Sequence, residues 1–120
     1  MTKITRPAEK LIYSYHAELC KVFSHPTRLQ IINILRDDEK IVGDMAKMLG
    51  VSIGNLSQHL SMMRERRILK ARKEGNQVYY RVANPKMLKA FDLLREILFE
   101  QIAKDSQLLS PGKIQRKEAR

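Results

Sequence analysis

The segment from Ser52 to Ser61 carries side chains that can exchange hydrogen bonds with nucleic-acid bases. Leu56, Leu60 and Met63 recur at four- and three-residue steps, which places them on one side of a helix, facing the core. The other side is short, polar and nearly uncharged, and Asn or Gln can pair with adenine through two hydrogen bonds. We name it the reading face, and its predicted members are Ser52, Gly54, Asn55, Ser57, Gln58, His59 and Ser61.

A basic stretch follows the reading face along the chain. From Arg64 to Arg81 there are seven Lys or Arg residues and only two acidic residues, Glu65 and Glu74. Phosphate contacts position a protein on duplex DNA, whereas base contacts select the sequence. The alternative is an ordinary solvated polar helix followed by a basic hairpin. The predicted phosphate-binding residues are Arg64, Arg66, Arg67, Lys70, Arg72, Lys73, Asn76 and Arg81.

Two helices and a hairpin must position these side chains. Ser52 is a good N-cap for a helix that runs to about Arg66, and a preceding helix from Asp44 to Leu49 closes at Gly50. Helix, short turn and helix make a helix-turn-helix. Period-two alternation then predicts a β-hairpin, or wing, in which Ile68–Lys73 and Val78–Val82 are joined by the polar turn Glu74–Gln77.

Further helices flank this unit. Apolar residues at helical spacing predict one helix over Glu9–Phe23 and another over Pro26–Arg36, and the imidazole of His25 can cap the second. Asn84–Pro85 starts a last helix, whose apolar stripe reaches Ile102–Ala103.

The predicted fold class is therefore mainly α with a β-hairpin, a winged helix-turn-helix of about five helices and a two-stranded wing. Ile41–Val42 can form one additional short strand.

The length of 120 residues suits one domain, which we place at 9–106, between a flexible N-terminus (1–8) and a basic, disordered tail (107–120). The net charge of +10 favours polyanions, such as nucleic acid or acidic lipid. No run of 18 apolar residues and no secretory signal is found, so we expect a cytoplasmic protein without a membrane partner. The single cysteine, Cys20, cannot form an internal disulfide, which fits a reducing compartment.

Three segments, in this order and at this spacing, resemble the ArsR family of bacterial and archaeal repressors. They are SHPTRLQIINIL at 24–35, DMAKMLGVSIGNLSQHL at 44–60 and RKEGNQVYYRV at 72–82, and the resemblance extends from about Tyr13 to Ile102. It implies a homodimer built from the first and last helices, double-stranded DNA targets with an inverted repeat, and release by an inducer. The SIGNLSQHL variant resembles members linked to sulfur chemistry.

The last helix also presents more apolar surface than one small domain readily covers, which agrees with a homodimer. The predicted interface residues are Leu11, Tyr15, Leu19, Leu88, Phe91, Leu94, Leu98 and Ile102.

The resemblance implies metal sensing in some family members, but the ligands of both common sites are missing here. Ile41 and Gly43 occupy the positions of the thiolates of one site, and the last helix has Asp92, Glu96 and Glu100 but no His for the other. We therefore predict no metal and no cofactor.

The candidate sensor residues are Cys20 and His16, which lie four residues apart and share one helical face. A structural role, thiol sensing and metal binding all stay open for this pair. An effector that acts on the thiol would be a thiol-reactive or sulfur species.

The sequence contains no Gly-rich phosphate loop, no nucleophile elbow and no arrangement of His and carboxylates for acid–base chemistry, so we predict that the protein is not an enzyme. The predicted function is a sequence-specific transcriptional regulator, a homodimeric repressor that an effector releases from DNA. The alternative is a winged-helix module that binds RNA or a protein partner without an effector switch.

Overall fold

The computed structural model describes residues 7–108. A boundary between two compact units falls inside the last helix, between Leu88 and Lys89, and each unit is described by itself. Residues 7 and 8 at the N-terminus and 107 and 108 at the C-terminus are helical, so helices extend slightly into both predicted flexible ends. The rest of those ends, 1–6 and 109–120, lies outside the described residues.

The described residues form five α-helices, one 3-10 helix and three β-strands, which confirms the mainly α, winged helix-turn-helix fold class. The elements in chain order are α1 (Pro7–Cys20), η1 (Lys21–Ser24), α2 (Pro26–Ile34), β1 (Lys40–Ile41), α3 (Val42–Leu49), α4 (Ile53–Glu65), β2 (Leu69–Glu74), β3 (Gln77–Val82) and α5 (Pro85–Leu108).

The first two helices end earlier at their C-termini than predicted. Helix α1 stops at Cys20 because the chain tightens into η1, which carries Val22 into the core. Helix α2 ends at Ile34, two residues before the predicted end. Its predicted cap is confirmed, since the backbone N–H of Thr27 donates to Nδ1 of His25 over 3.2 Å.

The helix-turn-helix forms as predicted. Gly50 takes a left-handed φ of 67° after α3, and its N–H donates to the carbonyl of Ala46 over 2.8 Å. A residue with a side chain would be strained there, so this glycine permits the sharp turn. The Ser52 hydroxyl then accepts from the backbone N–H of Asn55 over 3.1 Å and starts α4.

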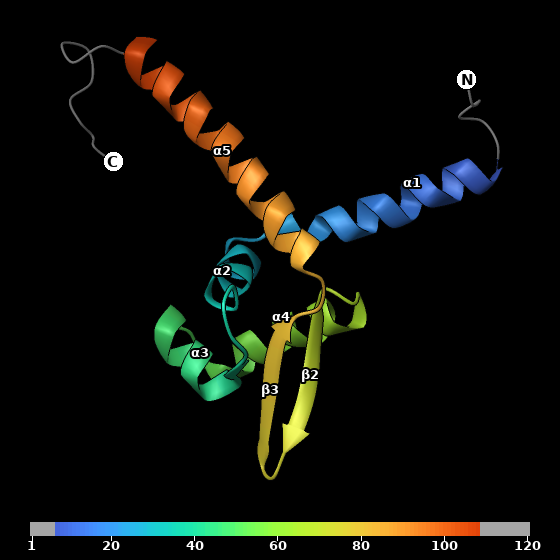
Figure 1. Ribbon diagram of the computed structural model, residues 1–120, viewed down its shortest axis with the longest axis vertical. Coiled ribbons are helices and arrows are strands. Elements are labelled where there is room, and N and C mark those ends of the chain that lie inside the picture. Colours follow the sequence, from blue (N-terminus) through green and yellow to red (C-terminus); the bar gives the residue numbers. More distant parts are fainter. Residues whose placement is uncertain (1–6, 109–120) are drawn as a thin grey trace. The chain divides into compact units, whose positions relative to one another are not determined.

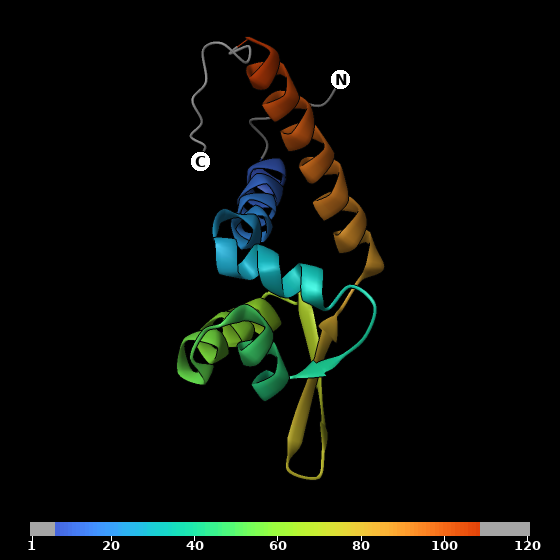
Figure 2. The ribbon, with the colours of Figure 1, turned by 90° about the vertical axis from the view of Figure 1, so that its left-hand side faces the viewer.

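The wing is a two-stranded hairpin, and a third strand pairs with the middle of β3. Figure 1 shows β2 and β3 running side by side away from α2, α3 and α4 to a turn at Gly75 and Asn76. Strand β1 pairs with β3, with Lys40 opposite Tyr80, and gives the sheet order β1-β3-β2. Figure 2 shows β1 as the short arrow beside the hairpin.

The additional short strand that the sequence allows at Ile41–Val42 is therefore confirmed one residue earlier, as β1 at Lys40–Ile41. Its pairing with β3 was not predicted, because the two segments lie far apart in the chain.

One hydrophobic core holds the first unit together. Its side chains come from η1, α2, α3, α4 and the wing, and each is at most 9% exposed. They are Val22, Ile31, Ile32, Leu35, Met45, Ala46, Leu56, Leu60, Met63, Ile68, Leu69 and Val82. Because Leu56, Leu60 and Met63 are fully buried, the opposite side of α4 faces solvent, as predicted.

Helix α5 extends to Leu108, past the predicted end near Ile102–Ala103. It leaves much of its apolar surface in water: Leu94 is 52% exposed, Leu98 49% and Ile102 49%. Phe91 differs, being only 3% exposed, and so offers little surface to a partner subunit. Within residues 7–108, no helix combines the length and the hydropathy needed to cross a membrane.

Candidate nucleic-acid interface

Helix α4 brings the predicted reading face together on one surface. Ser52, Gly54, Asn55, Gln58 and Ser61 are exposed. Ser57 and His59 are half-buried, in keeping with their places at the flanks of the face. These exposed members of the reading face carry hydroxyl and amide groups and no charge, so they can donate to and accept from base edges.

Ile53, the first residue of α4, is an exposed residue that sequence reasoning missed. It is 54% exposed, although apolar residues at helical spacing were taken to face the core. The sequence held a signal for this exposure. Ile53 lies three residues before Leu56, which places it at the edge of the apolar stripe and not at its centre. Because Ile53 is the first residue of α4, no earlier turn of the helix covers it.

His59 packs against a second imidazole. Its ring centroid lies 4.4 Å from that of His25, and its Nδ1 accepts from Nε of Arg28 at 3.4 Å. Partial burial, followed by the nearby charges of His25 and Arg28, lowers the pKa of His59. His59 thus connects the flank of the reading face to the start of α2.

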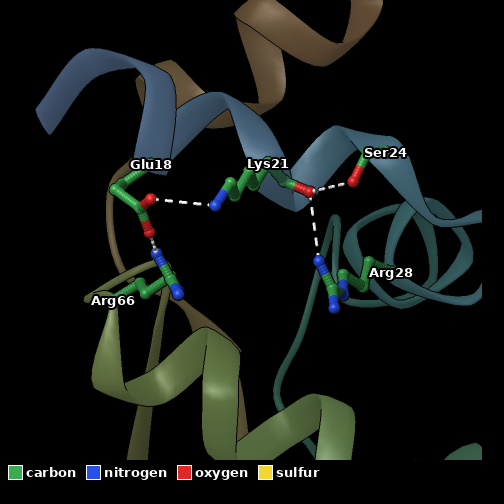
Figure 3. Close-up of polar contacts among 5 residues, drawn as sticks. All are labelled: Glu18, Lys21, Ser24, Arg28 and Arg66. Atoms are coloured by element: carbon green, nitrogen blue, oxygen red, sulfur yellow. Dashed lines mark hydrogen bonds and ion pairs between the residues drawn. The ribbon is translucent and has the colours of Figure 1, made fainter. Parts of the chain in front are cut away.

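A polar network joins α1 to the end of α4 (Figure 3). Glu18 accepts from Nζ of Lys21 over 2.9 Å and from the guanidinium of Arg66, the residue that caps α4. These hydrogen bonds, the Arg66 one foremost, lower the pKa of Glu18 to about 2. The carbonyl of Lys21 in turn accepts from Ser24 and Arg28. The predicted phosphate-binding residue Arg66 is therefore engaged by a carboxylate.

Arg72 is engaged more completely. Its guanidinium pairs with Glu39 and Glu74, with 2.7 Å from its Nε to Oε1 of Glu39, and lies 4.5 Å from the ring centroid of Tyr79. The hydrogen bonds to the two carboxylates raise the pKa of this guanidinium. The contact with Glu39 depends on β1 lying next to β3, which is why the linear sequence did not indicate it.

Arg64, Arg67 and Lys70 form a different kind of basic surface, which we name the basic hollow. They line a concavity together with Leu69 and Ala83, and no Asp or Glu is among the described residues that line it. Nor does any carboxylate in residues 7–108 pair with these three cations. Such cations keep their full charge for a phosphate.

The remaining predicted phosphate-binding residues lie on the wing and are exposed. Arg81 stands opposite Lys70 across the two strands and therefore shares its face, whereas Lys73 stands opposite Val78 on the other face. Arg81 also lines a hollow with Asp37, Asp38 and Glu39, so its surroundings are mixed in charge. Asn76 lies in the turn at the tip of the hairpin.

The candidate sensor residues Cys20 and His16 are both exposed on α1, and the thiol of Cys20 is free. In the part of the chain that is described, no group of three or more His, Cys, Asp or Glu residues could hold a metal ion.

A helix-turn-helix with a solvent-facing polar helix, a wing and unpaired cations defines the winged helix-turn-helix class of regulators. Comparison with known proteins identifies the family. Residues 25–71 match the model of bacterial regulatory proteins of the arsR family. The chain is 37% identical over 82 residues to the transcriptional repressor PagR of Bacillus anthracis, covering 68% of this chain and 82% of PagR.

Solved structures agree with this assignment. NolR from Sinorhizobium fredii superimposes with a TM-score of 0.72 at 29% identity, over 81% of this chain and 96% of NolR. The homodimeric winged helix-turn-helix DNA-binding domain Mb0332 from Mycobacterium bovis gives 0.73 at 25% identity, over 83% of this chain and 92% of that domain. The chain belongs to the ArsR family of transcriptional regulators.

Proposed function

We propose that the protein is a sequence-specific repressor that binds double-stranded DNA as a homodimer and leaves it when an effector binds. The observation that carries the proposal is the reading face of α4, whose exposed members are uncharged polar residues, with the cations Arg64, Arg67 and Lys70 at and beyond the end of the helix. Helices of this kind place their N-terminal residues against base edges in the major groove. The repressor assignment is supported by the similarity to PagR.

Two subunits are part of the proposal because α1 and α5 leave apolar side chains in water. Leu11, Tyr15 and Leu19 on α1 are 53%, 67% and 41% exposed, respectively. The stripe of Leu94, Leu98 and Ile102 on α5 is about half exposed. A second copy of the chain can cover both surfaces, and the homodimeric Mb0332 domain is a similar protein. A two-fold dimer calls for an inverted repeat in the DNA.

The proposed effector is a thiol-reactive or sulfur species that acts on Cys20. This thiol is exposed, and His16 lies one helical turn before it. Cys20 also lies two residues after Glu18, which binds Arg66 at the end of α4. Binding to the operator should respond to a polysulfide in the wild type and fail to respond in Cys20→Ser. An equal response in both proteins would exclude Cys20 as the sensor.

The test of base reading is the double variant Asn55→Ala, Gln58→Ala. DNA is first selected from a random duplex library with the wild type, and binding to the selected and to random duplexes is then compared. Each lost bidentate contact removes about 1–3 kcal/mol of discrimination, which is roughly five- to 140-fold. Binding to random DNA and its salt dependence should hardly change.

The matched control is Gln30→Ala, which removes an exposed glutamine of α2. This variant should keep the discrimination of the wild type. Equal weakening of the double variant on both DNAs would contradict base reading. A selection that enriches no duplex sequence would favour the alternative, a winged-helix module that binds RNA or a protein partner.

A further inference from the structure

Ile53 lies exposed beside the reading face, at the point of α4 that leads into the groove in the proposed complex. It is the first residue of the helix, and α-helical side chains tilt toward the N-terminus. Ser52, Gly54 and Asn55 around it are exposed as well. Leu56, the next core residue along the helix, is fully buried, whereas Ile53 is 54% exposed. More than half of this isoleucine therefore remains outside the packing of its own chain.

Gly54 gives a second, independent observation at the same place. Gly54 is the second residue of α4, and glycine is among the least favourable residues in a helix. A Cβ at Gly54 would meet nothing within 4 Å, and its φ is not in the left-handed region. Neither crowding nor backbone strain within the chain calls for a glycine. A surface that comes very close to the helix from outside would call for one.

The major groove offers one apolar group to such a helix end, the C5-methyl of thymine, since the other groups on the base edges are donors or acceptors. An exposed aliphatic side chain next to a residue without a side chain fits a close contact with that methyl. A phosphate would leave the apolar surface of Ile53 without a matching partner.

We propose that Ile53 packs against a thymine methyl, so that each half of the bound DNA carries a thymine at the position facing Ile53. This inference rests on the proposed function, because it needs α4 in the major groove. Asn55 and Gln58 then read hydrogen-bonding edges, while Ile53 reads a methyl group.

The experiment replaces the thymines of the selected duplex one at a time by deoxyuridine, which removes only the methyl. One thymine in each half should weaken wild-type binding on the order of fourfold when replaced, the contribution of one buried methyl. Ile53→Ala should bind the thymine and deoxyuridine duplexes equally at that position, and Ile53→Val should keep most of the difference.

The matched control is Met48→Ala, which truncates a side chain of α3 that is 58% exposed. It should leave the deoxyuridine effect unchanged. A selected duplex with no methyl-sensitive thymine, or an Ile53→Ala variant as sensitive as the wild type, would overturn this inference alone. A selection that enriches no sequence would overturn the proposed function, and this inference with it.

Discussion

Helices α4 and α5 are both amphipathic, yet they leave opposite kinds of surface in water. Helix α4 buries Leu56, Leu60 and Met63 completely and exposes its polar side. Helix α5 leaves Leu94 and Leu98 about half exposed. Burying apolar surface contributes roughly 25 cal/mol per Å², so α5 is stabilised by any apolar partner, whereas α4 gains little from one.

Helix α4 uses its apolar side to complete the fold of its own chain, whereas α5 leaves apolar surface that a partner subunit could cover. The polar side of α4 suits a partner with many hydrogen-bonding groups, as duplex DNA has. The apolar side of α5 suits another apolar surface, as a second copy of the chain has.

The largest effect is expected from charges on α5. Leu94→Glu combined with Leu98→Glu places two carboxylates in the apolar stripe and should dissociate the dimer in analytical ultracentrifugation. DNA affinity should then fall about a hundredfold or more, since a monomer engages only one half of the inverted repeat. The fold should persist by circular dichroism, because both side chains are already exposed.

Lys89→Glu is the control for charge. It changes the net charge by the same two units at an exposed position on the opposite side of α5. It should leave the protein dimeric. A double Leu→Glu variant that stays dimeric would remove the stripe from the interface.

A smaller effect is expected from the cations near α4. Arg64→Gln combined with Lys70→Gln removes two unpaired charges of the basic hollow. Each lost phosphate contact should lower the slope of log affinity against log salt by about 0.9. Arg72→Gln should lower it by less than half of one contact, because Glu39 and Glu74 already neutralise this guanidinium. Equal slopes for Arg72→Gln and a single Lys70→Gln variant would show that the ion pairs do not shield Arg72.

The sequence predicted the helices, the hairpin, the Ser52 cap and the two sides of α4, because these follow from local spacing and capping chemistry. It did not predict contacts between segments far apart in the chain. Arg66 looked as available as Lys70 until α1 placed Glu18 beside it. Arg72 looked available until β1 placed Glu39 beside it.

The exposure of individual apolar side chains was the second property that the sequence did not predict. Apolar spacing gives the direction of a side chain, but it does not say whether core material lies in that direction. Ile53 and Phe91 show both outcomes, since Ile53 is exposed and Phe91 buried. Which apolar side chains of α4 and α5 remain in water therefore follows from the structure and not from their spacing.

The smallest effect concerns His59, the titratable side chain that α4 partly buries. Its pKa is lowered from 6.5 by burial and by His25 and Arg28, so the unfolded chain takes up the proton more readily. Stability should thus be full above about pH 6.5 and fall as the pH drops below it. His59→Gln should reduce this loss of thermal stability between pH 7.5 and pH 5.5. His16→Gln, which removes an exposed histidine of α1, should reduce it less. Equal pH dependence in the wild type and His59→Gln would contradict this prediction, because it would mean that the surroundings of His59 do not disfavour its protonated form.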